Sequence, residues 1–202
     1  MKWKNDLIKD IRTGTEYDDR DYPFSHPLGH TKIQEITDCN RSSLLEYFMK
    51  VRDDAKSILE IGIGRNSEDS FAHVFFKNKK EETKYIGIDI EDRSWLIDCG
   101  ENVYTIEGDS SNYDENVKIF KKMGVKKFDF IFIDGWHSIN QVLLDWEYTN
   151  LLSDNGIVGF HDVSCHPGPY NFMNALDETK WNVEKNCCPD DWGIGFAWKK
   201  LN

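Results

Sequence analysis

The sequence has no long hydrophobic run and no cysteine pattern of the kind that disulfide-rich proteins carry. No apolar stretch approaches the roughly 18 residues of a membrane-spanning helix, and no apolar segment follows the charged start Met1–Asp6. The 5 cysteines are an odd number without a C-x-x-C pair, and Cys187 and Cys188 are adjacent. These absences predict a soluble, cytoplasmic protein with reduced thiols.

Positive charge is also scarce. The 202 residues contain 25 Lys and Arg against 36 Asp and Glu, which gives a formal charge of −11. Binding to duplexes or anionic membranes depends mainly on cationic side chains, so neither a nucleic acid nor a membrane is expected as a partner. Internal repeats and low-complexity segments are absent too, which excludes solenoids. With 39% hydrophobic and 13% aromatic residues, the chain has the composition of a globular domain.

Five short runs of β-branched and aromatic residues alternate with stretches that have helical spacing. These runs are Ser57–Ile61, Tyr85–Ile90, Val103–Ile106, Phe128–Ile133 and Gly156–Phe160. Helices are expected between them, most clearly at Asn116–Met123, which Gly124 ends, and at Ile139–Leu152, which Ser138 caps. Continuous apolar strands alternating with helices predict an α/β fold, with a parallel sheet covered on both faces.

The two ends of the chain differ from this alternation. Trp181–Glu184 and Ile194–Trp198 flank a turn-rich segment and predict a closing antiparallel hairpin. Residues 1–55 are irregular at first and then predict a helix from Thr31 to Val51, with Leu44 and Phe48 among the residues facing the sheet. We therefore expect an N-terminal appendage or lid over residues 1–55 on a single domain whose sheet occupies 56–202.

A glycine turn follows the first predicted strand. Gly62 and Gly64 come directly after Glu60 and Ile61, where a tight turn lets a ligand approach the backbone. A tight turn without a ligand explains these glycines equally well. Asp89 ends the second strand, 25 residues beyond Gly64, and an acidic residue there can accept both ribose hydroxyls of an adenosine. Two cofactors fit this pair of motifs, NAD and S-adenosylmethionine.

Three features favour S-adenosylmethionine. The third glycine of the dinucleotide motif is replaced by Ser67, so the close approach of a pyrophosphate is not prepared. Glu60 would oppose a diphosphate but suits a cofactor that carries an ammonium and a sulfonium. The third strand ends at Asp109 and Ser110, where an aspartate can accept from the adenine amine, although Asp109 could instead cap the following helix.

Two further strand ends carry groups suited to catalysis. Asp134 and His137 follow the fourth strand, and His161 and Asp162 follow the fifth. Ligands of open α/β sheets bind at these ends, so carboxylates and imidazoles should converge beside the cofactor. A divalent ion held by Asp134 and Asp162 would lower the pKa of an acceptor hydroxyl, and His137 would take its proton.

The chain resembles the class I S-adenosylmethionine-dependent methyltransferases, over about Ser57 to Asp162. The segments Ile133-Asp134-Gly135-Trp136-His137, Asp145-Trp146 and Gly156–Asp162 are most similar to the metal-dependent macrocin O-methyltransferase type. The resemblance implies a Rossmann-like three-layer αβα sandwich with a mostly parallel seven-stranded sheet and an antiparallel C-terminal hairpin. It matches Asp134 and Asp162 to metal ligands and His137 to the general base.

His161 departs from this family pattern, because many relatives have an oxygen ligand at its position. An imidazole would suit Mn²⁺, Fe²⁺ or Zn²⁺ better than Mg²⁺, unless His161 only orients Asp162. A structural zinc at His161, Cys165 and His166 is disfavoured, because no paired C-x₂₋₄-C element is present and residues 167–169 predict a loop.

Other site residues have structural alternatives. His137 could merely bond a nearby carbonyl, and Asp162 could be an ordinary turn aspartate. Trp136 would either stack on the adenine or pack against the sheet, and Trp146 belongs to the core.

The sequence thus predicts O-methylation of a hydroxyl on a small molecule or sugar, with S-adenosyl-L-methionine and a divalent metal, Mg²⁺ or Mn²⁺. The catalytic residues would be Asp134 and His137, and the metal ligands Asp134, His161 and Asp162. The cofactor would contact Glu60, Gly62, Gly64, Asp89, Asp109, Ser110, Asp134 and Trp136. The alternatives are an NAD-dependent oxidoreductase and an inactive binding protein on the methyltransferase fold. The irregular segments Asp10–His30 and His161–Asn174 are expected to meet the acceptor, and a homo-oligomer is compatible with the short lid.

Overall fold

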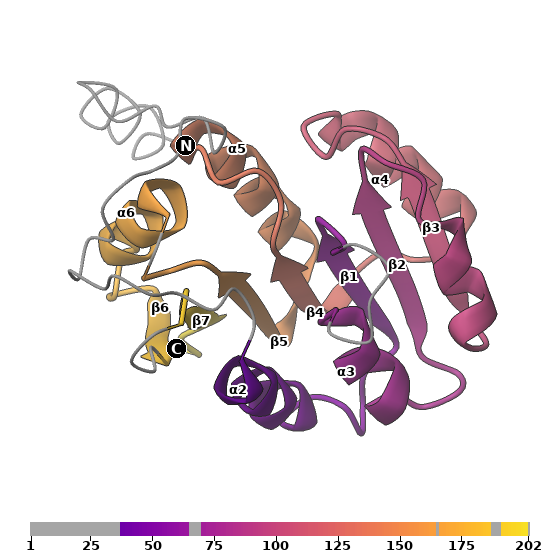
Figure 1. Cartoon of the computed structure of the whole chain (residues 1–202), viewed down its shortest axis with the longest axis horizontal. Coiled ribbons are helices and arrows are strands. Elements are labelled where there is room, and N and C mark those ends of the chain that lie inside the picture. Colours follow the sequence, from indigo (N-terminus) through magenta and orange to yellow (C-terminus); the bar gives the residue numbers. More distant parts are fainter. Residues whose placement is uncertain (1–36, 65–69, 165, 187–190, 202) are drawn as a thin grey trace.

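A seven-stranded sheet forms the centre of the molecule (Figure 1). The computed structural model describes residues 37–64, 70–164, 166–186 and 191–201. The strands are β1 (Ser57–Ile61), β2 (Lys84–Asp89), β3 (Val103–Glu107), β4 (Phe128–Ile133), β5 (Leu152–His161), β6 (Trp181–Asn186) and β7 (Ile194–Lys199). Their order is β3-β2-β1-β4-β5-β7-β6, and only the pairings of β7 are antiparallel. The α/β class, the mostly parallel sheet and the C-terminal hairpin are as predicted.

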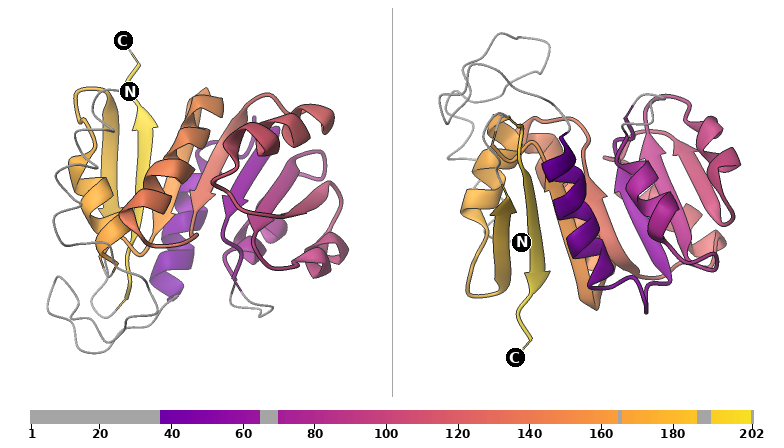
Figure 2. Two further views of the ribbon diagram at one scale, coloured as in Figure 1. Left: turned by 90° about the horizontal axis from the view of Figure 1, so that it is seen from above. Right: turned by 60° about the horizontal axis from the view of Figure 1, so that its bottom comes forward.

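Helices cover both faces of this sheet (Figure 2). One face carries α2 (Asp38–Met49), α3 (Ala72–Asn78) and η2 (Ser94–Cys99). The other carries α4 (Tyr113–Lys122), α5 (Ile139–Asp145), η3 (Trp146–Leu151) and α6 (Pro167–Ala175). Side chains alternate along each strand, so Ile58 of β1 joins the core under α2 and α3 while Leu59 joins the opposite core. The three-layer αβα architecture is confirmed.

Two predicted elements differ from the structure. The helix expected over Ile139–Leu152 is divided, because its second half continues as the 3₁₀ helix η3. The loop expected at residues 167–169 is wrong: these residues open helix α6. Proline fits the first turn of a helix, where its missing N–H would have no intrahelical partner, so a Pro-Gly-Pro segment can begin a helix as well as interrupt one.

Helix α2 ties the N-terminal part of the described chain to the sheet. It begins in a capping box in which the side chains of Thr37 and Asn40 bond each other's backbone N–H groups. Asp191, next to β7, accepts from both side chains, at 3.1 Å each. Leu44 and Phe48 are fully buried against the sheet, as predicted. Residues 1–36 lie outside the described part of the chain, so the division into a 1–55 appendage and a 56–202 domain stays a prediction.

Two further observations concern membrane-spanning helices and the cysteines. Within the described residues, no helix is long and apolar enough to cross a membrane. Cys99 is a free, exposed thiol, whereas Cys39 in α2 is disulfide-bonded. The prediction of reduced thiols throughout is therefore wrong for Cys39.

Candidate functional site

The glycine turn after β1 is held by the ends of two neighbouring strands. The Asp89 carboxylate accepts from the Ile63 N–H at 2.8 Å, and the Gly62 N–H donates to the Ile88 carbonyl at 2.9 Å. Gly62 has a φ of +78°, and a Cβ there would lie 2.1 Å from the Asp134 carbonyl oxygen. Only glycine combines this backbone angle with such a close approach, so the ends of β1 and β4 meet through Gly62.

A cavity of about 460 Å³ opens at the carboxyl ends of β1 to β4. Strand order reverses in the sheet between β1 and β4, and open α/β sheets bind ligands at such a switch point. The predicted site residues that line the cavity are Gly62, Gly64, Asp89, Asp109, Ser110, Asp134, Trp136 and His137. Trp136 is 39% exposed on this wall, so it is available to a ligand and does not pack into the sheet.

Glu60 lies apart from the cavity wall. It is 1% exposed beneath the glycine turn, where its carboxylate accepts from the Tyr85 hydroxyl. Burial raises the pKa of Glu60 to about 8, despite the Tyr85 bond, and the nearby Asp134 and Asp89 act in the same direction. Glu60 is therefore absent from the cavity lining, and its carboxylate bonds the neighbouring strand β2 through Tyr85.

The protonation of Glu60 predicts how stability depends on pH. Its folded pKa of about 8 lies above the usual 4.5, so folding takes up a proton between these values. The free energy of unfolding should therefore fall as pH rises from about 5 to 8, by on the order of a few kcal/mol. Glu60→Gln should flatten this fall in denaturant titrations. The exposed Glu107→Gln is the matched control, and identical pH slopes for Glu60→Gln and the unaltered protein would refute the burial argument.

A buried aspartate supports the wall of the cavity near Asp109. Asp145 is fully buried, and burial raises its pKa to about 7. Its Oδ1 accepts from Gln141 Nε2 at 2.9 Å, and the same amide donates to Ser110 Oγ at 2.9 Å. Asp145 therefore fixes the Gln141 and Ser110 side chains, both of which line the cavity.

The sequence analysis missed several cavity residues, among them Gln141 and Arg93. Gln141 lies four residues before Asp145 and so on the same helical face, which is the signal that would have found it. Arg93 lines the cavity beside Asp89, to which its Nε is paired at 3.3 Å, and it also donates to the Ile63 carbonyl at 2.9 Å. Arg93 could have been found in the sequence as a basic residue four positions after Asp89, the predicted ribose-binding acid.

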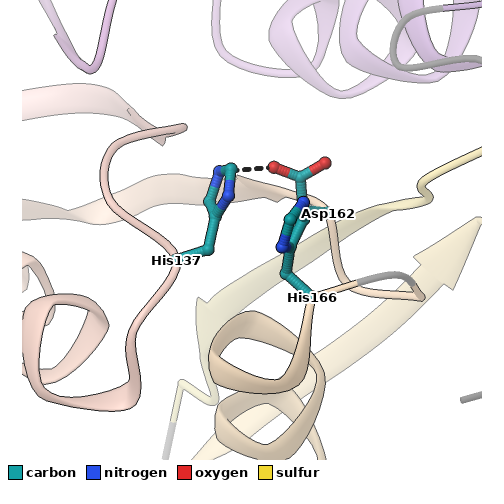
Figure 3. A group of neighbouring side chains, drawn as sticks. All are labelled: His137, Asp162 and His166. Atoms are coloured by element: carbon teal, nitrogen blue, oxygen red, sulfur yellow. Dashed lines mark ion pairs between the residues drawn. The ribbon is translucent and has the colours of Figure 1, made fainter. Parts of the chain in front are cut away.

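Beyond the cavity, His137 leads to a group of buried titratable side chains. His137 Nε2 lies 2.6 Å from Asp162 Oδ2, and the His137 ring packs on that of His166 with 4.1 Å between centroids (Figure 3). Asp162 and His166 are 1% and 4% exposed. Asp162 has a φ of +63°, a strained angle for a residue with a side chain, and such strain is found most often at functional sites.

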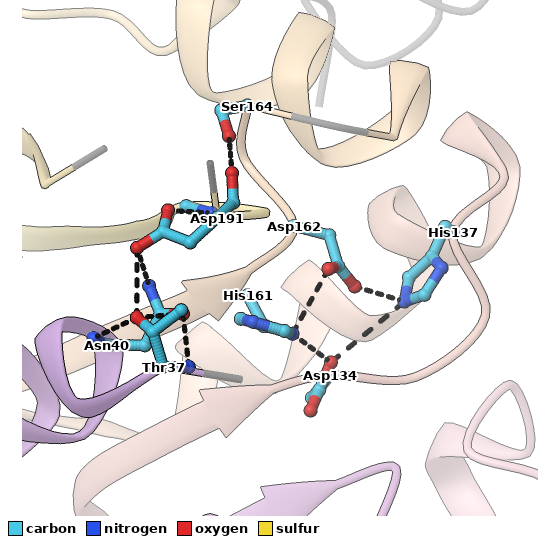
Figure 4. A network of polar contacts seen from close by, with 9 residues as sticks. Thr37, Asn40, Asp134, His137, His161, Asp162, Ser164 and Asp191 are labelled. Atoms are coloured by element: carbon cyan, nitrogen blue, oxygen red, sulfur yellow. Dashed lines mark hydrogen bonds and ion pairs between the residues drawn. The ribbon is translucent and has the colours of Figure 1, made fainter. Parts of the chain in front are cut away.

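His161 joins the two predicted metal-binding carboxylates (Figure 4). Its Nδ1 lies 3.1 Å from Asp134 Oδ1 and 3.1 Å from Asp162 Oδ1. Burial alone would lower the pKa of His161, but the two carboxylates outweigh it and raise the pKa to about 10. Burial likewise opposes the charge on Asp162, yet His161 and His137 hold its pKa well below the usual range. The structure thus brings Asp134, His137, His161 and Asp162 together, as predicted.

Two segments were predicted to contact the methyl acceptor, and the structure describes only the second of them. Asp10–His30 lies outside the described residues. His161–Asn174, expected to be irregular, is mostly helix α6, and its aromatic Phe172 is fully buried in the core. Phe172 therefore cannot meet an acceptor, and the prediction of an aromatic loop is wrong there.

Known proteins share both the family signature and the fold of this chain. A protein family described as "Methyltransferase domain" matches residues 59–163, about half of the chain. No curated protein sequence matches it. Among solved structures, MycE methyltransferase from the mycinamycin biosynthetic pathway, in complex with Mg and SAH, is 15% identical with a TM-score of 0.58. This alignment covers 97% of the present chain but 54% of MycE, so the chain spans about half the length of MycE.

Two other solved structures have the same fold at similar distance. CalS11, a calicheamicin methyltransferase, is 12% identical over 96% of this chain and 90% of its own, with a TM-score of 0.60. A putative rRNA-methylase from Clostridium thermocellum is 14% identical over 83% of this chain and 99% of its own, with a TM-score of 0.59. At such identities the likeness shows the shared fold.

Proposed function

The chain belongs to the methyltransferase-domain family, in the class I S-adenosylmethionine-dependent group that its sequence resembles, and we propose that it methylates a hydroxyl group of a small molecule. The observation that carries this proposal is the position of His137. Its side chain lines the cavity expected to hold the cofactor and is also paired with the buried Asp162. A base oriented by a carboxylate beside a methyl donor suits transfer to a weakly acidic hydroxyl.

The charge of the cavity supports S-adenosylmethionine over NAD. Among the described residues, four carboxylates line it, those of Asp89, Glu91, Asp109 and Asp134, against the one guanidinium of Arg93. Such a wall stabilises the ammonium and sulfonium charges of S-adenosylmethionine and repels a diphosphate. In the proposed arrangement Asp89 accepts from the ribose hydroxyls, and Asp109 and Ser110 meet the adenine.

His137 would carry the proton in the transfer. When its Nε2 donates to Asp162, Nδ1 holds the lone pair that accepts the hydroxyl proton. The acceptor oxygen then bonds the methyl carbon as the carbon–sulfur bond breaks, and that electron pair stays on sulfur to give S-adenosylhomocysteine. Asp162 remains ionised and stabilises the imidazolium that forms, because the charges around it keep its pKa low. Most of the remaining rate enhancement would come from orientation of the two reactants.

The proposal includes a divalent ion held by the two predicted metal-binding carboxylates and His161. One ligand atom from each of Asp134, His161 and Asp162 lies within 4.8 Å of the others. Two carboxylates and one imidazole suit Mn²⁺ or Fe²⁺ better than Mg²⁺, which strongly prefers oxygen, and His161 would have to lose its proton to bind. When bound, such an ion would lower the pKa of an acceptor hydroxyl.

The acceptor we propose is a hydroxylated small molecule, such as a sugar. The shared fold leaves this choice open, since it occurs both in CalS11, described as a TDP-rhamnose 3′-O-methyltransferase, and in a putative rRNA methylase. The net charge of −11 favours the small molecule over an RNA. The cytoplasmic location and the homo-oligomer stay predictions.

Ligand-dependent thermal unfolding tests the cofactor. S-adenosylhomocysteine at a hundredfold excess over its dissociation constant should stabilise the folded protein by about 2.7 kcal/mol and raise the melting temperature accordingly. NAD at the same concentration should leave the melting temperature unchanged. Protection by NAD alone would favour the oxidoreductase alternative. Tight S-adenosylhomocysteine binding without transfer to any hydroxylated compound would favour an inactive binding protein.

A further inference from the structure

The two carboxylate oxygens of Asp162 face two different groups of side chains that could bind a metal ion. Oδ1 lies 3.1 Å from His161, on the side of Asp134, whereas Oδ2 lies 2.6 Å from His137 (Figure 4). On the His137 side stands His166, which no part of the proposed transfer uses (Figure 3). One ligand atom from each of His137, Asp162 and His166 lies within 4.8 Å of the others.

We propose that His137, Asp162 and His166 form a second metal site, selective for a divalent transition-metal ion of the Zn²⁺ or Co²⁺ type. Two imidazoles and one carboxylate are a common ligand set for such ions. Mg²⁺ is a poor fit, since it demands oxygen ligands. The site is distinct from the Asp134, His161 and Asp162 group, because it uses the other oxygen of Asp162 and two other histidines.

The backbone holds the three ligands in place. The His166 N–H donates to the Asp162 carbonyl at 3.1 Å, which closes a turn of the chain between the two residues. Helix α6 starts directly after His166 and packs closely on the third ligand: a Cβ at Gly168 would lie 2.0 Å from the His137 carbonyl oxygen. Gly168 therefore allows α6 to bring His166 up to His137.

The surroundings of the three side chains also suit an ion. Asp162 and His166 are almost fully buried, so little water competes for them, while His137 lines the cofactor cavity and gives an ion access. The Trp192 ring packs nearly perpendicular to that of His166, with 5.1 Å between centroids, on one side of the imidazole. Buried, preoriented ligands bind metals more tightly than mobile surface ones.

A metal ion bound at this site would affect methyl transfer. This conclusion rests on the proposed role of His137 as the base. A neutral imidazole that ligates through Nε2 carries its proton on Nδ1, so it has no lone pair left for the proton of the acceptor. Filling the site should therefore inhibit methyl transfer. Mn²⁺ bound between Asp134 and Asp162 would have the opposite effect.

Cobalt binding tests the site directly. The full chain, stripped with a chelator, is titrated with Co²⁺, and its visible d–d absorption reports coordination by protein ligands. We expect one equivalent to bind and Zn²⁺ to displace it. His166→Gln should weaken Co²⁺ binding at least about tenfold, whereas Asp134→Asn should change it little. His166→Cys should restore binding and add a thiolate-to-cobalt charge-transfer band, which a purely structural role of His166 would not produce.

Several outcomes would overturn the site. It is refuted if His166→Gln binds Co²⁺ like the unaltered chain, or if Asp134→Asn loses binding while His166→Gln keeps it. Methyl transfer that stays undiminished while Co²⁺ is bound with these spectral features would overturn the predicted inhibition. Calorimetry of S-adenosylhomocysteine binding in the absence of metal distinguishes the two proposals. If the unaltered protein does not bind S-adenosylhomocysteine, the proposed function is refuted, whereas the metal site is not.

Discussion

His137→Gln should slow methyl transfer by roughly a hundredfold to ten-thousandfold, the usual contribution of a general base. The amide of glutamine cannot take the proton that His137 would accept, and the pairing of Nε2 with Asp162 at 2.6 Å is lost. Binding of S-adenosylhomocysteine should change little, because the carboxylates proposed to hold its adenosine remain. The rate is measured as S-adenosylhomocysteine released with an acceptor from a panel of hydroxylated compounds.

His73→Gln is the matched control for this variant. His73 lies on α3, where its ring contacts Phe76 and Trp95, and it does not line the cofactor cavity. Its replacement should leave the rate unchanged. A His137→Gln protein that transfers methyl groups at the rate of the His73→Gln protein would remove His137 from the mechanism.

Gly62→Ala should destabilise the protein by at least about 2 kcal/mol and abolish S-adenosylhomocysteine binding. The φ of +78° is unfavourable for alanine, and the added Cβ would lie 2.1 Å from the Asp134 carbonyl oxygen. Backbone atoms cannot rotate away as a flexible side chain can, so the ends of β1 and β4 would have to separate. Urea unfolding and calorimetric titration give the two quantities.

Gly64→Ala separates this clash from a general intolerance of the turn. The nearest atom to a Cβ at Gly64 is Ser70 Oγ, at an ordinary contact distance of 3.7 Å. The stability of Gly64→Ala should therefore stay close to that of the unaltered protein. Equal losses of stability in the two variants would contradict the account of why Gly62 is glycine.

The sequence was sufficient to predict the sheet and the strand ends. β1 and β4 have the predicted bounds, because β-branched, aromatic and other apolar residues dominate both runs and turns or charged residues bound them. Parallel strands end at one edge, so Asp89, Asp134 and Asp162 could be placed together before the structure was known. The roles of the loops between them could not be predicted in the same way.

The side-chain contacts of Glu60 could not be predicted from the sequence. Glu60 belongs to a strand that is buried on both faces, so no alternation of polar and apolar residues indicates where its side chain points. Its partner Tyr85 lies on the neighbouring strand, and only the register of β1 and β2 brings the two together. A carboxylate expected at the ligand is thus found bonded to a buried tyrosine.

The same limit applies to His166. His166 lies four residues after Asp162, and the two meet only because the chain turns between them. The Pro-Gly-Pro that follows indicated a loop and gave no sign of this turn or of helix α6. Its contact with His137, 29 residues earlier in the numbering, depends on the close packing of Gly168 on the His137 backbone. Tertiary packing of this kind leaves no periodic trace in a sequence.

A crystal structure of the protein with S-adenosylhomocysteine would show directly whether the cavity holds the cofactor. We expect the ligand to occupy the cavity at the ends of β1 to β4, with its ribose on Asp89, its adenine at Asp109 and Ser110, and its sulfur directed toward His137. A ligand bound elsewhere, or bound with its sulfur turned away from His137 and Asp134, would contradict the account.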